Sequence, residues 1–311
     1  MSLATPPRRT VAIAECLLVT LIWASSFILV KKALLHLGPL TIAGLRYWGG
    51  ALLLFPLFLR NHKTAPSLSR AAWIQLSLIG VSAYTVGNGA LFWSLQYLPA
   101  TTVSLLMSLL PVLILVLGAL WLKEIPSLGQ MLGVLISVGG SVLFFSQRPQ
   151  ADEWRGFFII VIAMAGFTLF AVLGRALARD TALDTLSRTT IPLAIGGGLL
   201  LLIAFFIEGC PTFTLTGGAI VGWLALVNTA LAYLLYNHAL QTLPALEMNM
   251  LLNLAPLGTA LLAWLLLAEQ LQGLQIVGMI TMLGGVILVQ QSGKQAPQRN
   301  TSSPNNPAKS A

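Results

Sequence analysis

Charged side chains are scarce in this chain: Asp, Glu, Lys and Arg together make up 8% of its 311 residues. An ordinary soluble domain has roughly a quarter charged residues, which keep its surface hydrated. Apolar residues reach 57%, and the mean hydropathy is +0.86. Because so few charges cannot cover a water-facing surface, we expect hydrocarbon to surround most of the protein.

Groups that carry common enzyme chemistry are also rare. The two cysteines, Cys16 and Cys210, give neither a disulfide framework nor a metal-ligand spacing. Of the three histidines, only His238 lies within a predicted span, and no G-x-S-x-G sequence accompanies it. A phosphate-binding GxxxxGK[ST] loop is missing as well. The sequence therefore predicts neither an enzyme nor a cofactor.

Long apolar runs dominate what is present. Each covers about 20 residues, enough for a helix to cross about 30 Å of hydrocarbon. The runs lack the two-residue alternation of a membrane barrel, so we predict an all-α integral membrane protein of ten transmembrane helices. We expect the helices at residues 11–31, 40–60, 71–95, 98–121, 127–147, 155–178, 189–207, 216–240, 244–267 and 272–291.

The net charge of +8 is distributed unevenly across these helices. Twelve Lys and Arg residues fall on the side of the amino terminus and four on the other, a bias typical of cytoplasmic loops rather than of nucleic-acid binding. We therefore expect a cytoplasmic N-terminal tail at 1–10 and a disordered cytoplasmic tail at 292–311. Glu15 interrupts the first apolar run and no cleavage site follows, so a retained helix is expected there.

The second half of the chain repeats the first. At an offset of 145, residues 99–140 align with 244–285 without a gap. We therefore divide the chain into two five-helix repeats at 11–147 and 155–291. An odd number of helices places the second copy upside down, with the binding site near the middle of the bilayer. Matched pairs include Pro99/Pro244, Pro111/Pro256, Glu124/Glu269, Gln130/Gln275, Gly133/Gly278, Gly139/Gly284 and Gly140/Gly285.

These features resemble a known family. The stretch Trp23-Ala-Ser-Ser-Phe27, the paired Pro, Glu, Gln and Gly spacing and the ten predicted helices are similar to the EamA-type drug/metabolite transporters. The resemblance covers roughly residues 10–290 and is closest in character to bacterial amino-acid exporters, including aromatic ones. It implies a secondary transporter that exports small metabolites across the bacterial inner membrane.

Polar residues near two matched prolines predict the binding site. Pro111 and Pro256 each interrupt a helix and free a carbonyl, so we expect kinks or hinges there around a central cavity. Ser104 and Ser108 share the face of Pro111, and a polar stripe is costly against lipid. Packing between helices is the alternative role for such residues. The predicted substrate-binding residues are Tyr84, Asn88, Ser104, Ser108, Thr168, Tyr233, Asn237, His238, Asn249 and Asn253.

Few ionisable groups fall within the spans. Arg46 is expected to extend outward to an aromatic belt beside Trp48, with binding of a substrate carboxylate as the alternative. Glu15 is expected near the membrane interface and His238 in a structural hydrogen bond, although either residue suits proton coupling. Glu124 and Glu269 are assigned to structure, opposite N–H groups that open the following helices.

The predicted cavity indicates the class of cargo. The helices that carry the stripe lack Lys and Arg except Lys123 at one end, so phosphorylated cargo is not expected. Hydroxyls, amides and aromatic walls favour a neutral or zwitterionic metabolite. We expect a monomer in lipid that binds a small molecule and no nucleic acid. Uniport and proton antiport both stay open, and a channel or scaffold is the remaining alternative.

Overall fold

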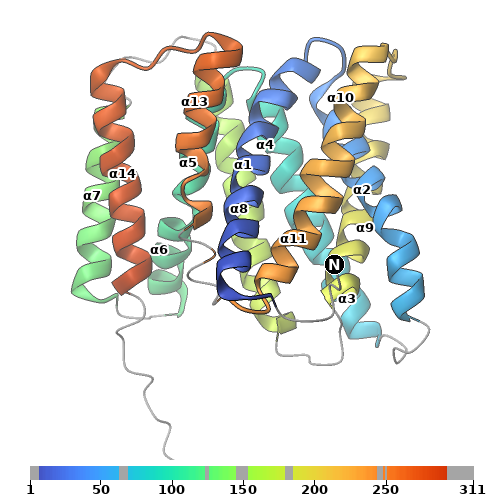
Figure 1. The fold of residues 1–311 in the computed structure, drawn as a ribbon, viewed down its shortest axis with the longest axis horizontal. Helices are drawn as coiled ribbons and strands as arrows, with labels where there is room; N and C mark the ends of the chain where they lie inside the picture. Colours follow the sequence, from blue (N-terminus) through green and yellow to red (C-terminus); the bar gives the residue numbers. More distant parts are fainter. Residues whose placement is uncertain are drawn as a thin grey trace, which may run out of the picture.

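The computed structural model describes residues 7–62, 69–122, 126–144, 153–178, 185–243, 248 and 251–292. All regular structure within these ranges is helical, as predicted. The helices lie side by side in one bundle, and their axes run broadly in one direction (Figure 1). An all-α membrane architecture is therefore confirmed.

Most predicted helices match the observed bounds within a few residues. The long rods are α1 (Arg9–Ala33), α2 (Pro39–His62), α8 (Glu153–Ala178), α9 (Thr185–Glu208) and α14 (Gly273–Ser292). Two further rods are composite: α3 (Arg70–Gly80), η1 (Val81–Asn88) and α4 (Gly89–Ser94) form one, and α10 (Leu215–Ala225), η2 (Leu226–Leu231) and α11 (Ala232–Ala239) form the other. Shorter helices are α5 (Ala100–Ser108), α6 (Leu110–Leu122), α7 (Leu128–Phe144) and α13 (Ala255–Leu267).

Within the described residues, six helical stretches are long and apolar enough to cross a membrane. The composite rod 215–239 is one of them, and shorter apolar helices lie at 100–116, 128–144 and 255–267. Outward-facing side chains such as Leu135, Phe158 and Phe206 are 67%, 73% and 82% exposed, as a lipid-facing surface requires. The protein is thus multi-pass, while the count of ten spans stays a prediction.

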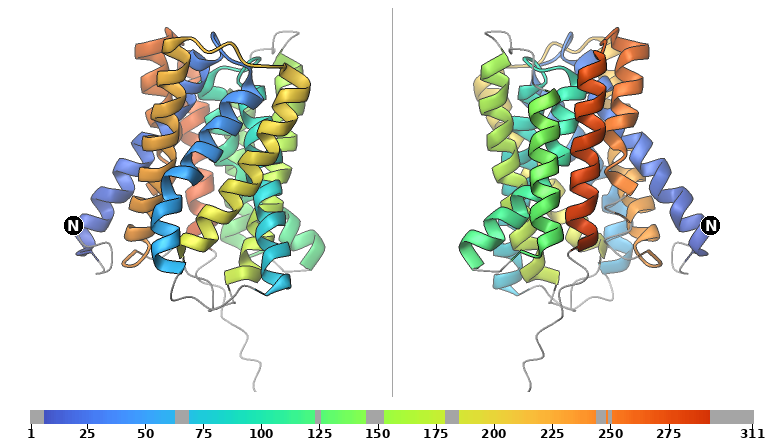
Figure 2. Two further views of the ribbon diagram at one scale, coloured as in Figure 1. Left: turned by 90° about the vertical axis from the view of Figure 1, so that its right-hand side faces the viewer. Right: turned by 90° about the vertical axis from the view of Figure 1, so that its left-hand side faces the viewer.

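Glycines bring α7 and α14 into backbone contact. A Cβ on Gly133 would lie 2.7 Å from the carbonyl oxygen of Gly285, and a Cβ on Gly140 would lie 2.7 Å from that of Gly278. The 145-residue offset converts one contact into the other, since Gly133 matches Gly278 and Gly140 matches Gly285. The order of the contacts also shows that the two helices run antiparallel. The two helices lie side by side at one end of the bundle (Figures 1 and 2). A Cβ on Gly139, by contrast, would meet nothing within 4 Å, although Gly139 is also matched between the repeats.

The other equivalent helices follow the same symmetry. In the α2–α9 pair, a Cβ on Gly44 would meet Leu201, and a Cβ on Gly197 would meet Trp48, so these helices are also antiparallel. The first helix, α1, packs on the composite rod 215–239, and its counterpart α8 packs on the composite rod 70–94. Two copies that face opposite ways explain this reciprocal packing.

Both predicted kinks coincide with breaks in the helices. The α5 helix ends at Ser108 and α6 begins at Leu110, so that Pro111 is the second residue of a new helix. Pro256 holds the same position in α13. Proline lacks the N–H that an unbroken helix would use, which accounts for an interruption directly before each ring. That these breaks flex during transport remains our proposal.

Candidate functional site

An aromatic cluster joins the two repeats inside the bundle. It consists of Trp23 from α1, Tyr47 from α2, Tyr84 and Phe92 from the first composite rod, and Tyr233 and Tyr236 from the second. The hydroxyls of Tyr84 and Tyr233 are hydrogen-bonded, 3.1 Å apart. The ring centroids of Tyr47 and Tyr84 are 5.0 Å apart, and those of Trp23 and Tyr233 are 5.9 Å apart. The structure thus brings two predicted site residues together.

A second polar contact fixes this cluster. The Tyr47 hydroxyl donates to Oδ1 of Asn88 at 2.5 Å, and the Asn88 amide donates to the carbonyl of Ala83 at 2.8 Å. Asn88 is buried, and a hydrogen bond on each polar atom of its amide fixes the side chain. Sequence reasoning selected Asn88 and missed Tyr47, because the residues beside Trp48 were expected at an outer aromatic belt.

Tyr84 and Asn88 lie on π-helical backbone, and Tyr233 follows a second π-helical segment directly. Segments η1 and η2 begin at Val81 and Leu226, which are equivalent at the 145-residue offset. In each segment a side chain donates to the carbonyl five residues earlier: Asn88 to Ala83, and Thr229 to Leu224 at 3.0 Å. Wide helical turns of this kind often occur at functional sites because they turn side chains out of the regular spacing. The sequence gives no direct signal for them.

Arg46 also lies within this region, and the expectation that it extends outward is wrong. Its side chain is 5% exposed. Nε donates to the Thr229 hydroxyl at 3.0 Å, Nη2 to the Asn228 carbonyl at 3.1 Å, and Nη1 to the Ser26 hydroxyl. Trp48 is 42% exposed, because two residues along a helix place the side chain on nearly the opposite face.

Three predicted residues are buried but bonded within their own helices. The hydroxyls of Ser104, Ser108 and Thr168 donate to the carbonyls of Thr101, Leu105 and Met164 at 3.0, 2.6 and 2.8 Å. Their burial agrees with an inward-facing stripe. Hydrogen bonds between these three side chains and the aromatic cluster are absent from the described contacts.

The predicted amides differ in their contacts. Asn237 approaches the Thr189 hydroxyl at 3.5 Å, the outer limit for a hydrogen bond. Asn253 is 9% exposed, and its Nδ2 has no hydrogen-bond partner among the described residues. A buried donor without a partner is costly, so an acceptor on a bound molecule would be favourable there. Asn249 lies outside the described residues.

His238 forms a hydrogen bond, and its partner is Glu15. Nδ1 lies 2.8 Å from Oε1 and 3.0 Å from Oε2 of the carboxylate, and both side chains are buried. Glu15 is 7% exposed and thus buried within the protein, while its position near the membrane interface stays a prediction. The pair joins α1 of the first repeat to α11 of the second.

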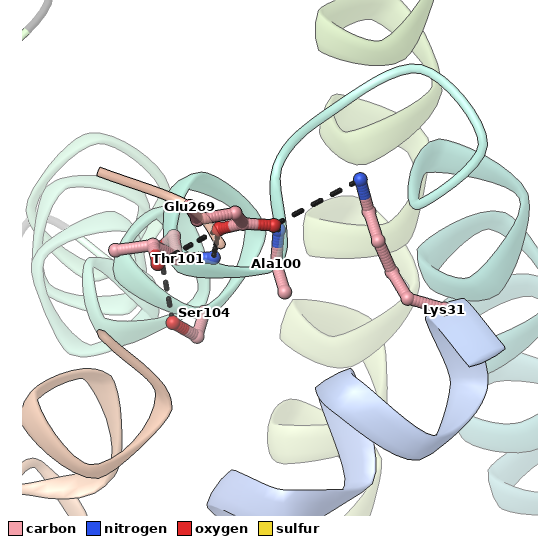
Figure 3. A network of polar contacts seen from close by, with 5 residues as sticks. All are labelled: Lys31, Ala100, Thr101, Ser104 and Glu269. Carbon is pink, nitrogen blue, oxygen red and sulfur yellow. Dashed lines mark hydrogen bonds and ion pairs between the residues drawn. The ribbon is translucent and has the colours of Figure 1, made fainter. Parts of the chain in front are cut away.

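Glu269 lies in a separate polar network (Figure 3). Its carboxylate accepts the N–H of Ala100 at 2.9 Å and of Thr101 at 3.3 Å, together with the Thr101 hydroxyl at 3.0 Å. Nζ of Lys31 lies 3.9 Å away. The carboxylate therefore offsets the N-terminal dipole of α5, and not that of the following helix as expected. Glu124 lies outside the described residues.

Comparison with known proteins identifies the family of this chain. The model of the EamA-like transporter family matches twice, at residues 10–146 and 154–290, so the chain belongs to that family. An uncharacterized transporter of Archaeoglobus fulgidus is 27% identical over 87% of this chain and 94% of its own length. Protein PecM of Dickeya dadantii is 28% identical, over 72% of this chain and 76% of its own.

Two further similarities fit this assignment. The uncharacterized inner membrane transporter YedA of Escherichia coli is 26% identical over 73% of both chains. A solved crystal structure superposes with a TM-score of 0.65 and covers 93% of this chain and 100% of its own, at 15% identity, which shows a shared fold. The protein is thus a multi-pass membrane transporter of small molecules, and not an enzyme.

Proposed function

We propose that this transporter exports small neutral or zwitterionic metabolites, amino acids including aromatic ones, across the bacterial inner membrane. In this proposal it acts as a monomer, with both termini in the cytoplasm. The observation that carries the proposal is the hydrogen bond between Tyr84 and Tyr233, which joins the two repeats within the aromatic cluster.

The chemistry of the cluster suits such a cargo. Aromatic rings supply apolar area with defined faces, and their hydroxyls supply hydrogen bonds at the edge of the same surface. Asn88 contributes an amide to the cluster, and in this proposal Asn253 of the polar stripe adds an Nδ2 donor that has no described partner. A site of apolar walls with a few fixed polar groups is the usual form of a small-molecule site.

The antiparallel repeats support an alternating-access mechanism. Two copies that face opposite ways can exchange conformations, so that the site opens to each side in turn. Residues between the copies must then break and remake contacts in each cycle. The Tyr84–Tyr233 bond is one such contact, and the breaks before Pro111 and Pro256 are the proposed flexible points.

Counterflow in reconstituted vesicles tests this proposal. Vesicles preloaded with one unlabelled amino acid from a panel should take up the labelled amino acid transiently, whereas a channel gives no such overshoot. Tyr84→Phe and Tyr233→Phe keep the rings and remove the hydroxyl pair, so uptake should fall roughly fivefold. Tyr97→Phe, outside the cluster, is the matched control. Absence of counterflow for the whole panel would contradict the proposal.

The outward direction needs a separate test in cells. Expression should make cells more resistant to toxic amino-acid analogues such as fluorophenylalanine, because an exporter lowers their internal concentration. Greater sensitivity would indicate import instead.

The Glu15–His238 pair favours proton antiport as the driving mechanism. An ionisable pair within membrane-spanning helices is costly and commonly marks a proton or ion pathway. Cargo added to vesicles should then produce a saturable pH change in a lumen loaded with a pH dye. If labelled cargo enters without proton movement, the transporter is a uniporter.

A further inference from the structure

Arg46 is a cation buried among uncharged groups. Arginine stays protonated inside proteins, and the effective cost of burying a charge without a partner is several kcal/mol. The Arg46 side chain is 5% exposed. Each hydrogen bond described for its guanidinium goes to a neutral oxygen, on Ser26, Asn228 or Thr229.

No carboxylate in the described part of the chain is bonded to this cation. Glu15 pairs with His238, Glu208 accepts the N–H groups of Leu40 and Thr41, and Glu269 accepts those that open α5. Glu153, at the first residue of α8, lies in the field of Lys31. The guanidinium has five N–H donors and uses three in the described bonds, so donors as well as charge remain for a ligand.

The surroundings of the guanidinium define the rest of a site. Its central carbon lies 5.1 Å from the ring centroid of Tyr47 and 5.5 Å from that of Phe92. Tyr47 in turn contacts Tyr84 and Asn88, so the cation belongs to the same aromatic cluster that joins the repeats. An anionic group at Arg46 would thus have aromatic surface beside it for an apolar body.

We propose that Arg46 binds a carboxylate of the cargo, and that the transported class is monocarboxylates with an apolar or aromatic body. This rests on the proposed transport function, and it extends the substrate class from neutral and zwitterionic metabolites to anions with one carboxylate. Amino acids are one subset of that class. Their ammonium group is not required, because the described part of the cluster contains no acid to bind it. Sequence reasoning set aside phosphorylated cargo from the helices with the polar stripe, and it kept carboxylate binding at Arg46 of α2 as the alternative to an outward position.

The single positive charge of Arg46 favours an anion with one negative charge. One guanidinium balances one negative charge and can form two parallel hydrogen bonds to a carboxylate. A phosphate dianion would leave a second buried charge without a partner. A free amine would add a positive charge beside Arg46 and is disfavoured by repulsion.

Matched probes on the unmodified protein test the proposal directly. Phenylpyruvate, phenylalanine and phenethylamine share an aromatic body, and 4-methyl-2-oxopentanoate with isopentylamine forms an aliphatic pair. We expect thermal stabilisation in detergent and counterflow in vesicles with the carboxylates but not with the amines. Stabilisation by the amines equal to that by the carboxylates would overturn the proposal.

Variants at Arg46 supply the second test. Arg46→Gln should weaken carboxylate binding by roughly 10- to 100-fold, as expected for loss of hydrogen bonds to a charge. Arg46→Lys should retain part of the binding. Ser26→Ala removes one support of the guanidinium and keeps the charge, so it should change binding much less. If Arg46→Gln does not insert, the probe comparison on the unmodified protein decides alone.

The outcomes also separate this inference from the general function. If amines or neutral molecules are transported and carboxylates are not, the protein is still a carrier, but Arg46 does not bind a carboxylate of the cargo. Carboxylate transport that Arg46→Gln leaves unchanged would do the same. If no compound in either series binds or moves, the substrate class is wrong and the proposed function loses its support as well.

Discussion

The carboxylate of Glu15 lies 2.8 Å from Nδ1 of His238, across the boundary between the two repeats. Of the described elements packed on α1 in this part of the fold, α5, α10, α13 and η2 carry no ionisable side chain. The other ionisable groups on α1 and α11 near the pair are Cys16 and Tyr236, and Arg46 reaches α1 from α2 at Ser26. Among the described residues, the buried neighbours of the pair on α1 and α11 include the apolar side chains Ala12 and Ala239.

The burial of this ionisable pair predicts a role in coupling that is separable from binding. Glu15→Gln and His238→Gln should abolish uptake driven by a pH gradient, because neither variant can exchange a proton at the pair. Counterflow at equal pH should persist within about fivefold, since a single neutral hydrogen bond contributes only about 1 kcal/mol. Both rates are measured in the same vesicles.

A conservative change nearby controls for damage to packing. Cys16→Ser alters the adjacent buried residue and leaves the pair intact, so gradient-driven uptake should continue. Gradient-driven uptake at the normal rate in Glu15→Gln would exclude the pair from coupling.

The glycine contacts predict a stability difference between neighbouring residues. Gly140→Ala should destabilise the protein by about 1–3 kcal/mol, the usual cost of overpacking. A Cβ there would lie 2.4 Å from the backbone nitrogen of Met282. Gly139→Ala meets nothing within 4 Å and should cause no loss. Thermal unfolding in detergent measures both, and equal midpoints would contradict the close approach of α7 and α14.

The fold was largely predictable because membrane spans leave a strong and simple signal. Apolar length located the helices, and the repeated Pro, Glu and Gly positions indicated two copies. The face of each helix that points into the bundle was less predictable. Gly133 and Gly140 are seven residues apart and share a face, whereas the adjacent Gly139 points about 100° away.

The site was only partly predictable for the same physical reason. Tyr84, Asn88 and Tyr233 were identified from their polar chemistry, and their meeting depends on the π-helical turns. Those turns change the spacing from i, i+4 to i, i+5, which the assumption of a uniform period cannot anticipate. Arg46 was misplaced because closeness to a helix end was given more weight than the face on which it lies.

The Glu269 network predicts that a helix start is stabilised by a carboxylate from the other repeat. Glu269→Ala should cost about 2 kcal/mol, because the buried N–H groups of Ala100 and Thr101 lose a charged acceptor. Lys31→Met should cost under about 1 kcal/mol, since its 3.9 Å ion pair is partly exposed. Unfolding midpoints of the two variants separate the cap from the ion pair. A larger loss in Lys31→Met would reverse this assignment.

Asn253 and Ser108, which are equivalent positions at the 145-residue offset, predict different outcomes in the two repeats. The Ser108 hydroxyl already donates to the Leu105 carbonyl, so Ser108→Ala should change apparent affinity by less than about threefold. Nδ2 of Asn253 has no described partner, and Asn253→Leu should weaken binding roughly tenfold if cargo supplies its acceptor. Tryptophan at either position should block counterflow by filling the space, while surface expression continues. Concentration dependence of counterflow measures all four variants, and normal affinity in Asn253→Leu would remove this amide from the site.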